Sequence, residues 1–268
     1  MYTGGEDEYL NEELTQSVNR YESMIKSKSE WYFDVHELEA IFDFYFSQKK
    51  YQAAKEVLVL GQRFHPNSEV LTLKEAQIFI ERGDGKKALK LIELVEPIDQ
   101  NNEQLYLIKG SAYLIQDNID AALEAYLRAL EISEEPEEWV LNMSFAFQRL
   151  AEFDKAVHVL NLVRLRSPHN EEIVWELAVC YEQSGQDELS IKTYKEFLDM
   201  DPFSDAGWFN LGVILNQIGK YTESIEAFDY VLAIAPDFNA ALFNKANALA
   251  NDEQHVLAIQ NYAEFLME

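Results

Sequence analysis

Hydrophobic residues along this chain recur with the spacing of α-helices. In the stretch WFNLGVILNQIGKYTESIEAFDYVLAIAP, residues 208 to 236, apolar side chains return every three or four positions on either side of Gly219. A recurrence of this kind places them on one face of a helix. The stretch therefore predicts two helices joined by a turn, and no alternating pattern typical of β-strands competes with it.

The same pattern returns every 34 residues over most of the chain. Four of the prolines are separated by multiples of 34 residues, namely Pro66, Pro168, Pro202 and Pro236. A fixed period of this size is typical of stacked repeats. Cutting at this period gives seven blocks without insertion or deletion, which begin at Val35, Glu69, Glu103, Glu137, Glu171, Asp205 and Asn239.

Small and large residues occupy fixed positions in these blocks. The eighth residue is small in all blocks but the first, and the twenty-fourth residue is bulky in every block. The twentieth residue is always small: Ala54, Ala88, Ala122, Ala156, Ser190, Ser224 and Ala258. Small residues allow two helices to approach closely, so each block predicts two antiparallel helices of roughly 12 to 14 residues.

A turn signal separates the two predicted helices of each block. Gly83, Gly185 and Gly219 stand at the same position of their blocks. Glycine takes the positive φ that ends many helices at no steric cost. Other blocks have residues such as Lys49, Asp117 and Ala151 at this turn.

These positions resemble the 34-residue pattern of the tetratricopeptide repeat family, W-x2-L-G-x2-Y, then A-x3-F, then P. In the best-matching block the matches are Trp208, Leu211, Gly212, Phe228 and Pro236, with conservative departures at Leu215 and Ser224. The resemblance covers residues 35–268 and implies an all-α fold, a right-handed α-solenoid of helical hairpins. Glu75, Lys109 and Lys245 stand where the family usually has Leu, and we expect these side chains to snorkel toward solvent rather than to reach a partner, which is the alternative.

The two ends of the chain depart from the repeat. Residues 1–34 predict an acidic tail and a capping helix whose buried face carries Leu10, Leu14, Val18, Tyr21 and Ile25. The last block, from residue 239, stops at Glu268 without a polar capping helix. We therefore expect either a continuation of the chain beyond this end or burial of the end in an oligomer or partner.

Charge narrows the range of partners. The chain has 22 Lys and Arg against 48 Asp and Glu, a net charge of −26. Such a charge disfavours nucleic acid and acidic membrane surfaces as partners. The charge is uneven, since residues 49–90 carry nine basic against five acidic residues, and residues 171–268 carry four against eighteen.

The remaining sequence signals favour a cytoplasmic location. The single Cys180 cannot form an intramolecular disulfide, and no stretch has the pattern of a signal peptide or a membrane-spanning helix.

Residues capable of chemistry do not form a recognisable site in the sequence. No two histidines have the spacing of a helical zinc site, and Cys180 occupies a position that is apolar in the other blocks. Gly83 to Lys87 lacks the spacing of a phosphate-binding loop and is better explained as a turn. We therefore expect no catalytic residues, no metal site, no cofactor and no enzyme activity in these residues.

The resemblance implies that the first helices of the hairpins line a concave groove that binds proteins or peptides. The second, fifth, sixth, ninth, twelfth and thirteenth residues of each block are then expected to face the groove. The candidate residues are Asn142, Phe145, Trp175, Glu176, Phe209, Asn210, Val213, Asn216, Gln217, Phe243, Asn244, Asn247 and Asn251. Aromatic members would receive partner side chains, and amides would pair with an extended peptide backbone.

Alternatives to this interpretation remain open. The aromatic residues at the fifth position are equally well explained by packing between repeats, and part of the amide series belongs to the general pattern of the family. Lys74 is the only basic residue at the second, fifth and sixth positions, which disfavours binding of acidic chaperone tails. Besides a non-catalytic interaction scaffold, the chain is compatible with the N-terminal targeting or substrate-recruiting region of a larger enzyme or regulator, or with self-association through its C-terminal face.

Overall fold

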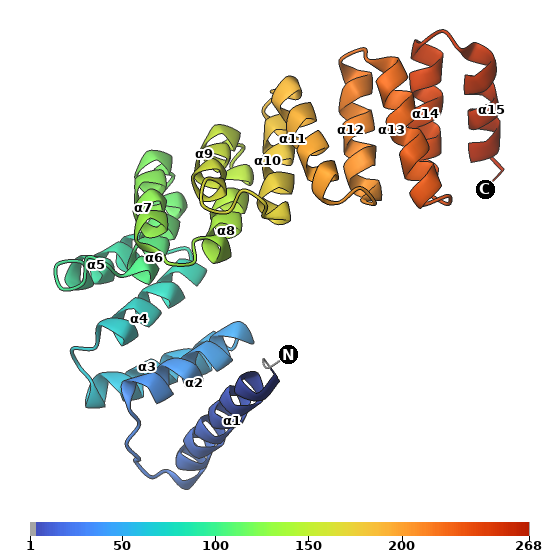
Figure 1. The fold of residues 1–268 in the computed structure, drawn as a ribbon. Helices are drawn as coiled ribbons and strands as arrows, with labels where there is room; N and C mark the ends of the chain where they lie inside the picture. Colours follow the sequence, from blue (N-terminus) through green and yellow to red (C-terminus); the bar gives the residue numbers. More distant parts are fainter. Residues whose placement is uncertain (1–3, 268) are drawn as a thin grey trace. The chain divides into compact units, whose positions relative to one another are not determined.

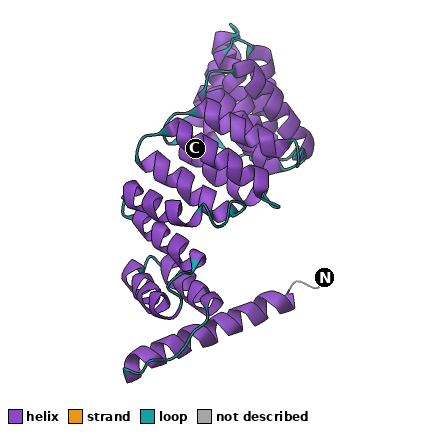
Figure 2. Ribbon diagram, turned by 90° about the vertical axis from the view of Figure 1, so that its left-hand side faces the viewer, coloured by secondary structure: helices purple, strands orange, loops and turns teal. Residues whose placement is uncertain are grey.

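The computed structural model describes residues 4–267, with side chains from residue 12 onward. The described residues form fifteen α-helices joined by short turns, and no strand occurs among them (Figure 2). Helix α1 (Gly4–Ser27) precedes seven helical hairpins (Figure 1). The all-α fold expected from the sequence is confirmed.

The first helix of every hairpin begins on the first residue of one of the 34-residue blocks. These helices are α2 (Val35–Ser47), α4 (Glu69–Glu81), α6 (Glu103–Ile115), α8 (Glu137–Gln148), α10 (Glu171–Gln183), α12 (Asp205–Gln217) and α14 (Asn239–Asn251). The second helices are α3 (Tyr51–Phe64), α5 (Gly85–Val95), α7 (Ile119–Ile132), α9 (Phe153–Arg164), α11 (Asp187–Met200), α13 (Tyr221–Ile234) and α15 (His255–Phe265).

The chain divides into two compact units, Met1–Ser133 and Glu134–Glu268. Helices α1 to α7 belong to the first unit and α8 to α15 to the second. Within each unit the two helices of a hairpin pack together, and the second helix also packs against the first helix of the next hairpin. Each unit is thus a stack of hairpins, the building principle of an α-solenoid. The division into a capping segment and one array from residue 35 stays a prediction.

Every hairpin turn contains one residue with a positive φ. These residues are Lys49, Gly83, Asp117, Ala151, Gly185, Gly219 and Glu253, with φ between 58° and 81°. The N–H of the following residue donates to the carbonyl five residues earlier at 2.8 to 3.0 Å in all seven turns. This bond closes the end of the first helix as in a Schellman motif.

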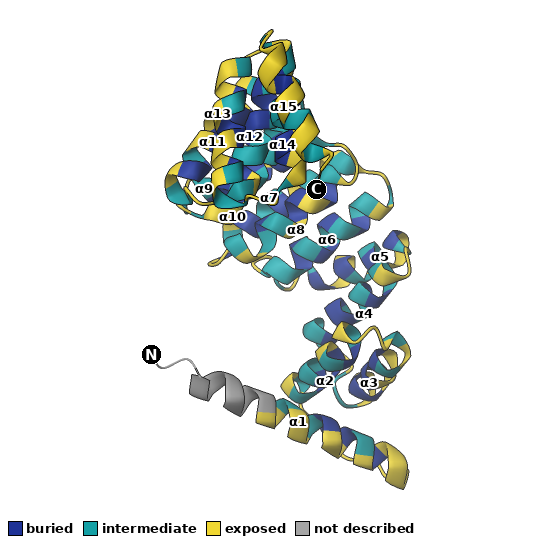
Figure 3. Cartoon of the chain, turned by 90° about the vertical axis from the view of Figure 1, so that its right-hand side faces the viewer, coloured by how far each residue is buried: buried dark blue, intermediate teal, exposed yellow. Residues whose placement is uncertain are grey.

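The two helices of a hairpin touch at the small residues. Ser190 Oγ donates to the Ala178 carbonyl at 2.8 Å, and Ser224 Oγ donates to the Gly212 carbonyl at 2.7 Å. The same hydrogen bond therefore occurs within each of these two hairpins. A Cβ atom on Gly212 would lie 2.8 Å from the nearest atom of the Phe228 ring. Buried positions consequently lie on the helix sides that face a neighbour, as the burial colours of Figure 3 show.

The three charged residues at the seventh position of their blocks are partly exposed, and each has a polar contact within the fold. Each contacts the second helix of the preceding hairpin or the residue that caps its end. The pairs are Glu75 with Gln62 at 2.8 Å, Lys109 with Glu96 at 2.6 Å and Lys245 with Asp229 at 2.6 Å. Snorkelling of these side chains stays a prediction, whereas their polar partners come from a different repeat, which the pattern of a single block does not contain.

Helix α1 covers the first hairpin through a buried face slightly different from the expected one. Val18, Tyr21 and Met24 are buried there, whereas the expected Ile25 is 51% exposed. A step of three residues from Tyr21 reaches Met24 and a step of four reaches Ile25, and both spacings fit one helical face. The side chain of Leu10 lies outside the described residues.

Cys180 on α10 is fully buried, and its Sγ lies 3.8 Å from the hydroxyl of Ser144 on α8. Burial raises the pKa of the Cys180 thiol from its ordinary value of 9.0 to about 11. Because the thiolate is the reactive form, this environment suppresses thiol chemistry.

The environment of Cys180 predicts slow labelling of the folded protein. At about pH 7.5 the higher pKa alone reduces the thiolate fraction about 100-fold relative to the unfolded chain. We expect a thiol reagent to modify the native protein at least about 100-fold more slowly than the protein unfolded in urea. The absorbance of the released chromophore measures both rates. Cys180→Ala provides the blank, and equal rates in both states would contradict the buried placement.

The turns predict opposite effects of two reciprocal substitutions. Gly185→Ala should lower the free energy of unfolding by about 1 kcal/mol, because a Cβ atom disfavours the positive φ of this residue. No described atom outside the turn lies within 4 Å of that Cβ, so the effect is purely conformational. Ala151→Gly should raise the stability by up to about 1 kcal/mol. Urea unfolding followed by circular dichroism measures both; unchanged midpoints would contradict the prediction.

Candidate partner-binding surface

All thirteen residues proposed from the sequence lie on the first helices of the second unit, and none of them is buried. Together with their neighbours on α8, α10, α12 and α14 we call this the first-helix surface. Asn142, Phe145, Gln217, Phe243 and Asn251 are exposed, and the other eight are partly exposed. The eight are Trp175, Glu176, Phe209, Asn210, Val213, Asn216, Asn244 and Asn247.

Aromatic rings of this surface rest on the second helix of their own hairpin. The ring pairs are Trp175 with Tyr194 at 5.7 Å, Phe209 with Phe228 at 5.9 Å and Phe243 with Tyr262 at 5.8 Å between centroids. Trp175 also meets Phe197 edge-to-face at 5.1 Å. One side of each ring is therefore held by the fold, while part of the ring stays accessible.

Amides of this surface are already engaged by the fold in part. Asn251 Nδ2 donates to Asn216 Oδ1 at 3.1 Å, which joins α14 to α12. The other contacts are Tyr262 Oη to Asn247 Oδ1 at 2.6 Å, Asn244 Nδ2 to the Ala240 carbonyl at 2.8 Å, and a hydrogen bond between Asn210 and Tyr194. Within the described part of the chain, the side chains of Asn142 and Gln217 have no hydrogen-bond partner.

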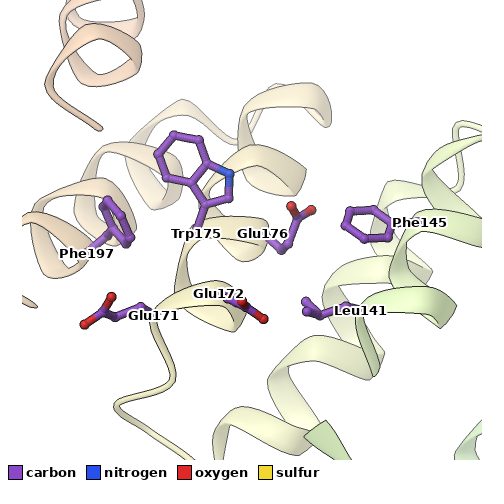
Figure 4. A pocket seen from close by; sticks show the side chains of 7 residues that line it. All are labelled: Leu141, Phe145, Glu171, Glu172, Trp175, Glu176 and Phe197. Atoms are coloured by element: carbon purple, nitrogen blue, oxygen red, sulfur yellow. The ribbon is translucent and has the colours of Figure 1, made fainter. Parts of the chain in front are cut away.

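A pocket of about 390 Å³ lies where α8, α10 and α11 meet (Figure 4). Its lining consists of Leu141, Phe145, Glu171, Glu172, Trp175, Glu176 and Phe197. Five of these seven side chains stand at the second, fifth, sixth or ninth position of their blocks, the positions expected to face a groove. The pocket is thus a hollow in the first-helix surface, with carboxylates and aromatic rings in its wall.

Glu176 is the carboxylate of this wall whose environment the fold alters most clearly. Partial burial raises the pKa of Glu176, and the hydrogen bond from Gln148 Nε2 to Glu176 Oε2 at 3.0 Å offsets this in part. Gln148 lies at the end of α8, so the contact also ties α8 to α10. The charge of Glu176 is therefore held close to an apolar wall with one neutral donor beside it.

Four residues of the pocket were missed among the sequence candidates: Leu141, Glu171, Glu172 and Phe197. Leu141 and Glu172 occupy groove positions, so their position alone was a sufficient signal. Phe197 lies on a second helix, at the twenty-seventh position of its block. In the other blocks only Phe265 is equally bulky at this position. The large ring at a position that is usually small was the one sequence signal that could have identified Phe197.

The rest of the described chain offers few other sites. Lys74 is buried and contacts Asp43 at 2.8 Å and Glu39 at 3.1 Å, so it is not available to an acidic peptide. Burial raises the pKa of Asp43, and the contact with Lys74 opposes this. No group of three metal-ligating side chains occurs among the described residues, and no described helix is long and apolar enough to cross a membrane.

Comparison with known proteins agrees with this architecture. Two family profiles described as tetratricopeptide repeat match the chain, one at residues 103–136 and the other at residues 146–205, 188–237 and 217–266. Together they cover more than half of the chain. The solved C-terminal part of a TPR repeat-containing protein from Cytophaga hutchinsonii aligns with a TM-score of 0.59 at 15% identity, over 83% of this chain and 98% of that one.

Two curated relatives share low sequence identity with the chain over long segments. The BBSome complex member BBS4 of Bos taurus is 23% identical over 220 residues, which cover 81% of this chain and 42% of that protein. The human protein O-mannosyl-transferase TMTC3 is 24% identical over 168 residues, 61% of this chain and 18% of that protein. The chain thus spans less than half the length of either relative. By its family matches and by its stacked helical hairpins, the chain belongs to the tetratricopeptide repeat family, whose fold is typical of protein–protein interaction scaffolds.

Proposed function

We propose that the second unit binds an extended segment of a partner protein on the first-helix surface. The observation that carries this proposal is the pocket between α8, α10 and α11, which hollows that surface and combines aromatic rings with polar groups. Ligand sites are typically concave and mostly apolar, with a few polar groups that set orientation.

The side chains of this surface suit a peptide because the fold holds many of them in place. The rings of Trp175, Phe209 and Phe243 are packed on one side, so little side-chain freedom is lost when a partner covers the other side. Amides such as Asn210 and Asn244 offer both a donor and an acceptor, and an extended backbone presents both kinds of group. The surface is therefore suited to bind the backbone of an extended partner segment through its amides and some of the partner's side chains through its rings.

We further propose that the described residues carry no reaction of their own. The sole thiol is buried with a raised pKa, and the carboxylates of the pocket have no nucleophile or basic group in the pocket lining with which to act. BBS4 is named as a member of a complex, which agrees with a scaffold role for a related array.

A second candidate is that this array recruits substrates for a larger enzyme. The observation in its favour is the similarity to TMTC3, which is named as a transferase. The matched segment covers 18% of that protein. The full open reading frame distinguishes the two candidates, since a catalytic domain beside the array would favour the second and further repeats the first.

Peptide selection tests the proposed function. A random peptide library displayed on phage is selected against the immobilised full chain, and the affinities of enriched peptides are measured by fluorescence anisotropy. We expect Asn210→Ala combined with Asn244→Ala to weaken binding roughly 5- to 150-fold, because each of the two lost backbone hydrogen bonds contributes about 0.5–1.5 kcal/mol.

The matched control removes a side-chain amide from the second helix of a hairpin, outside the first-helix surface. Gln260→Ala changes an exposed side chain on α15 and should leave the affinity unchanged. Thermal unfolding verifies that all variants fold. If no peptide is enriched, or if the Asn210 and Asn244 variant binds as tightly as the wild type, the first-helix surface is not the binding site.

A further inference from the structure

We propose that the pocket between α8, α10 and α11 binds a lysine or arginine side chain, so that the partner is a basic segment. This inference rests on the proposed function, since it assigns the chemistry of one position along the bound segment. Three observations carry it: the unpaired carboxylates of the pocket, its apolar walls and the acidity of the surrounding unit.

The carboxylates of Glu171, Glu172 and Glu176 form no ion pair within the part of the chain whose side chains are described. Other partly buried charges of this chain do have a cation beside them, as Glu96 has Lys109. Glu171 and Glu172 are exposed, whereas Glu176 is partly buried. A cation entering the pocket is attracted by all three charges and offsets the loss of hydration at Glu176.

The apolar walls complement the stem of a long basic side chain. Glu172 and Glu176 lie between the Trp175 ring and the side chains of Leu141 and Phe145 (Figure 4). Lysine and arginine bury their methylene groups along apolar surface while the charged head reaches polar groups. An indole ring near the head also attracts a cation through its π face.

Size and charge argue against other occupants. A volume of about 390 Å³ lies at the low end of the range for ligand sites, which suits one side chain better than a large ligand. An apolar side chain would bury the Glu176 charge further without compensation, and an acidic one would be repelled. The acidic excess of residues 171–268, eighteen against four basic residues, attracts a basic segment at longer range.

The test compares the sequences of peptides selected by different forms of the full chain. The phage library is selected against the wild type and against Glu172→Gln combined with Glu176→Gln, which keeps the shape of both side chains. We expect lysine or arginine at one fixed position in the wild-type peptides and loss of that preference in the variant. Replacing that residue by norleucine should lower wild-type affinity on the order of 10- to 100-fold, with a smaller loss at high salt.

The charge-matched control is Glu226→Gln combined with Glu264→Gln, two exposed carboxylates on second helices. It should keep the preference for a basic residue. Peptides enriched without such a preference, or a preference that survives in the pocket variant, would overturn this inference while leaving the binding surface intact. Absence of any enriched peptide would instead overturn the proposed function itself.

Discussion

The close approach of two helices at one pair of small residues is the constraint on which the rest of this structure depends. The twentieth position of each block is almost completely buried, from Ala54 to Ala258. At Ser190 and Ser224 the contact is tight enough for a side-chain hydroxyl to reach the carbonyl of the facing helix. A larger side chain there would separate the helices and open the core, because protein interiors tolerate little change in volume. Once this contact is made, the side of each first helix that the second helix leaves uncovered is free to contact other repeats or solvent.

Residues of the first-helix surface also stabilise the fold. Aromatic rings at the fifth position serve both purposes, since Trp175 packs on Tyr194 and Phe197 while it also lines the pocket. Such a ring costs little entropy when a partner binds because its rotamer is already restricted. Packing within the fold and exposure to a ligand are therefore compatible explanations of the same residue. Trp175 and Phe209 pack on the second helix of their own hairpin and also against apolar clusters that include residues of the next hairpin.

The charged residues whose side chains are described fall into two groups, those paired within the fold and those without a partner of opposite charge. Basic groups that are shielded from solvent, such as Lys74 and Lys245, each contact a carboxylate of a neighbouring helix, and these contacts hold repeats together. The carboxylates around Trp175 contact no basic group among the described side chains. Since an unpaired charge near an apolar wall is costly, this difference separates the charges that stabilise the stack from those available to a partner.

The sequence by itself determined the helices, their turns and their period. Small and bulky positions repeat every 34 residues, and the left-handed residue falls at one position even where it is Ala151 or Glu253, because local geometry and short-range packing decide these features. Tertiary structure alone decided which residues of different repeats meet. The choice of Met24 over Ile25, the pairing of Lys109 with Glu96 and the addition of Phe197 to a pocket with Phe145 depend on the angle and offset between neighbouring helices. Those quantities are set by packing across repeats, and a pattern within one block does not contain them.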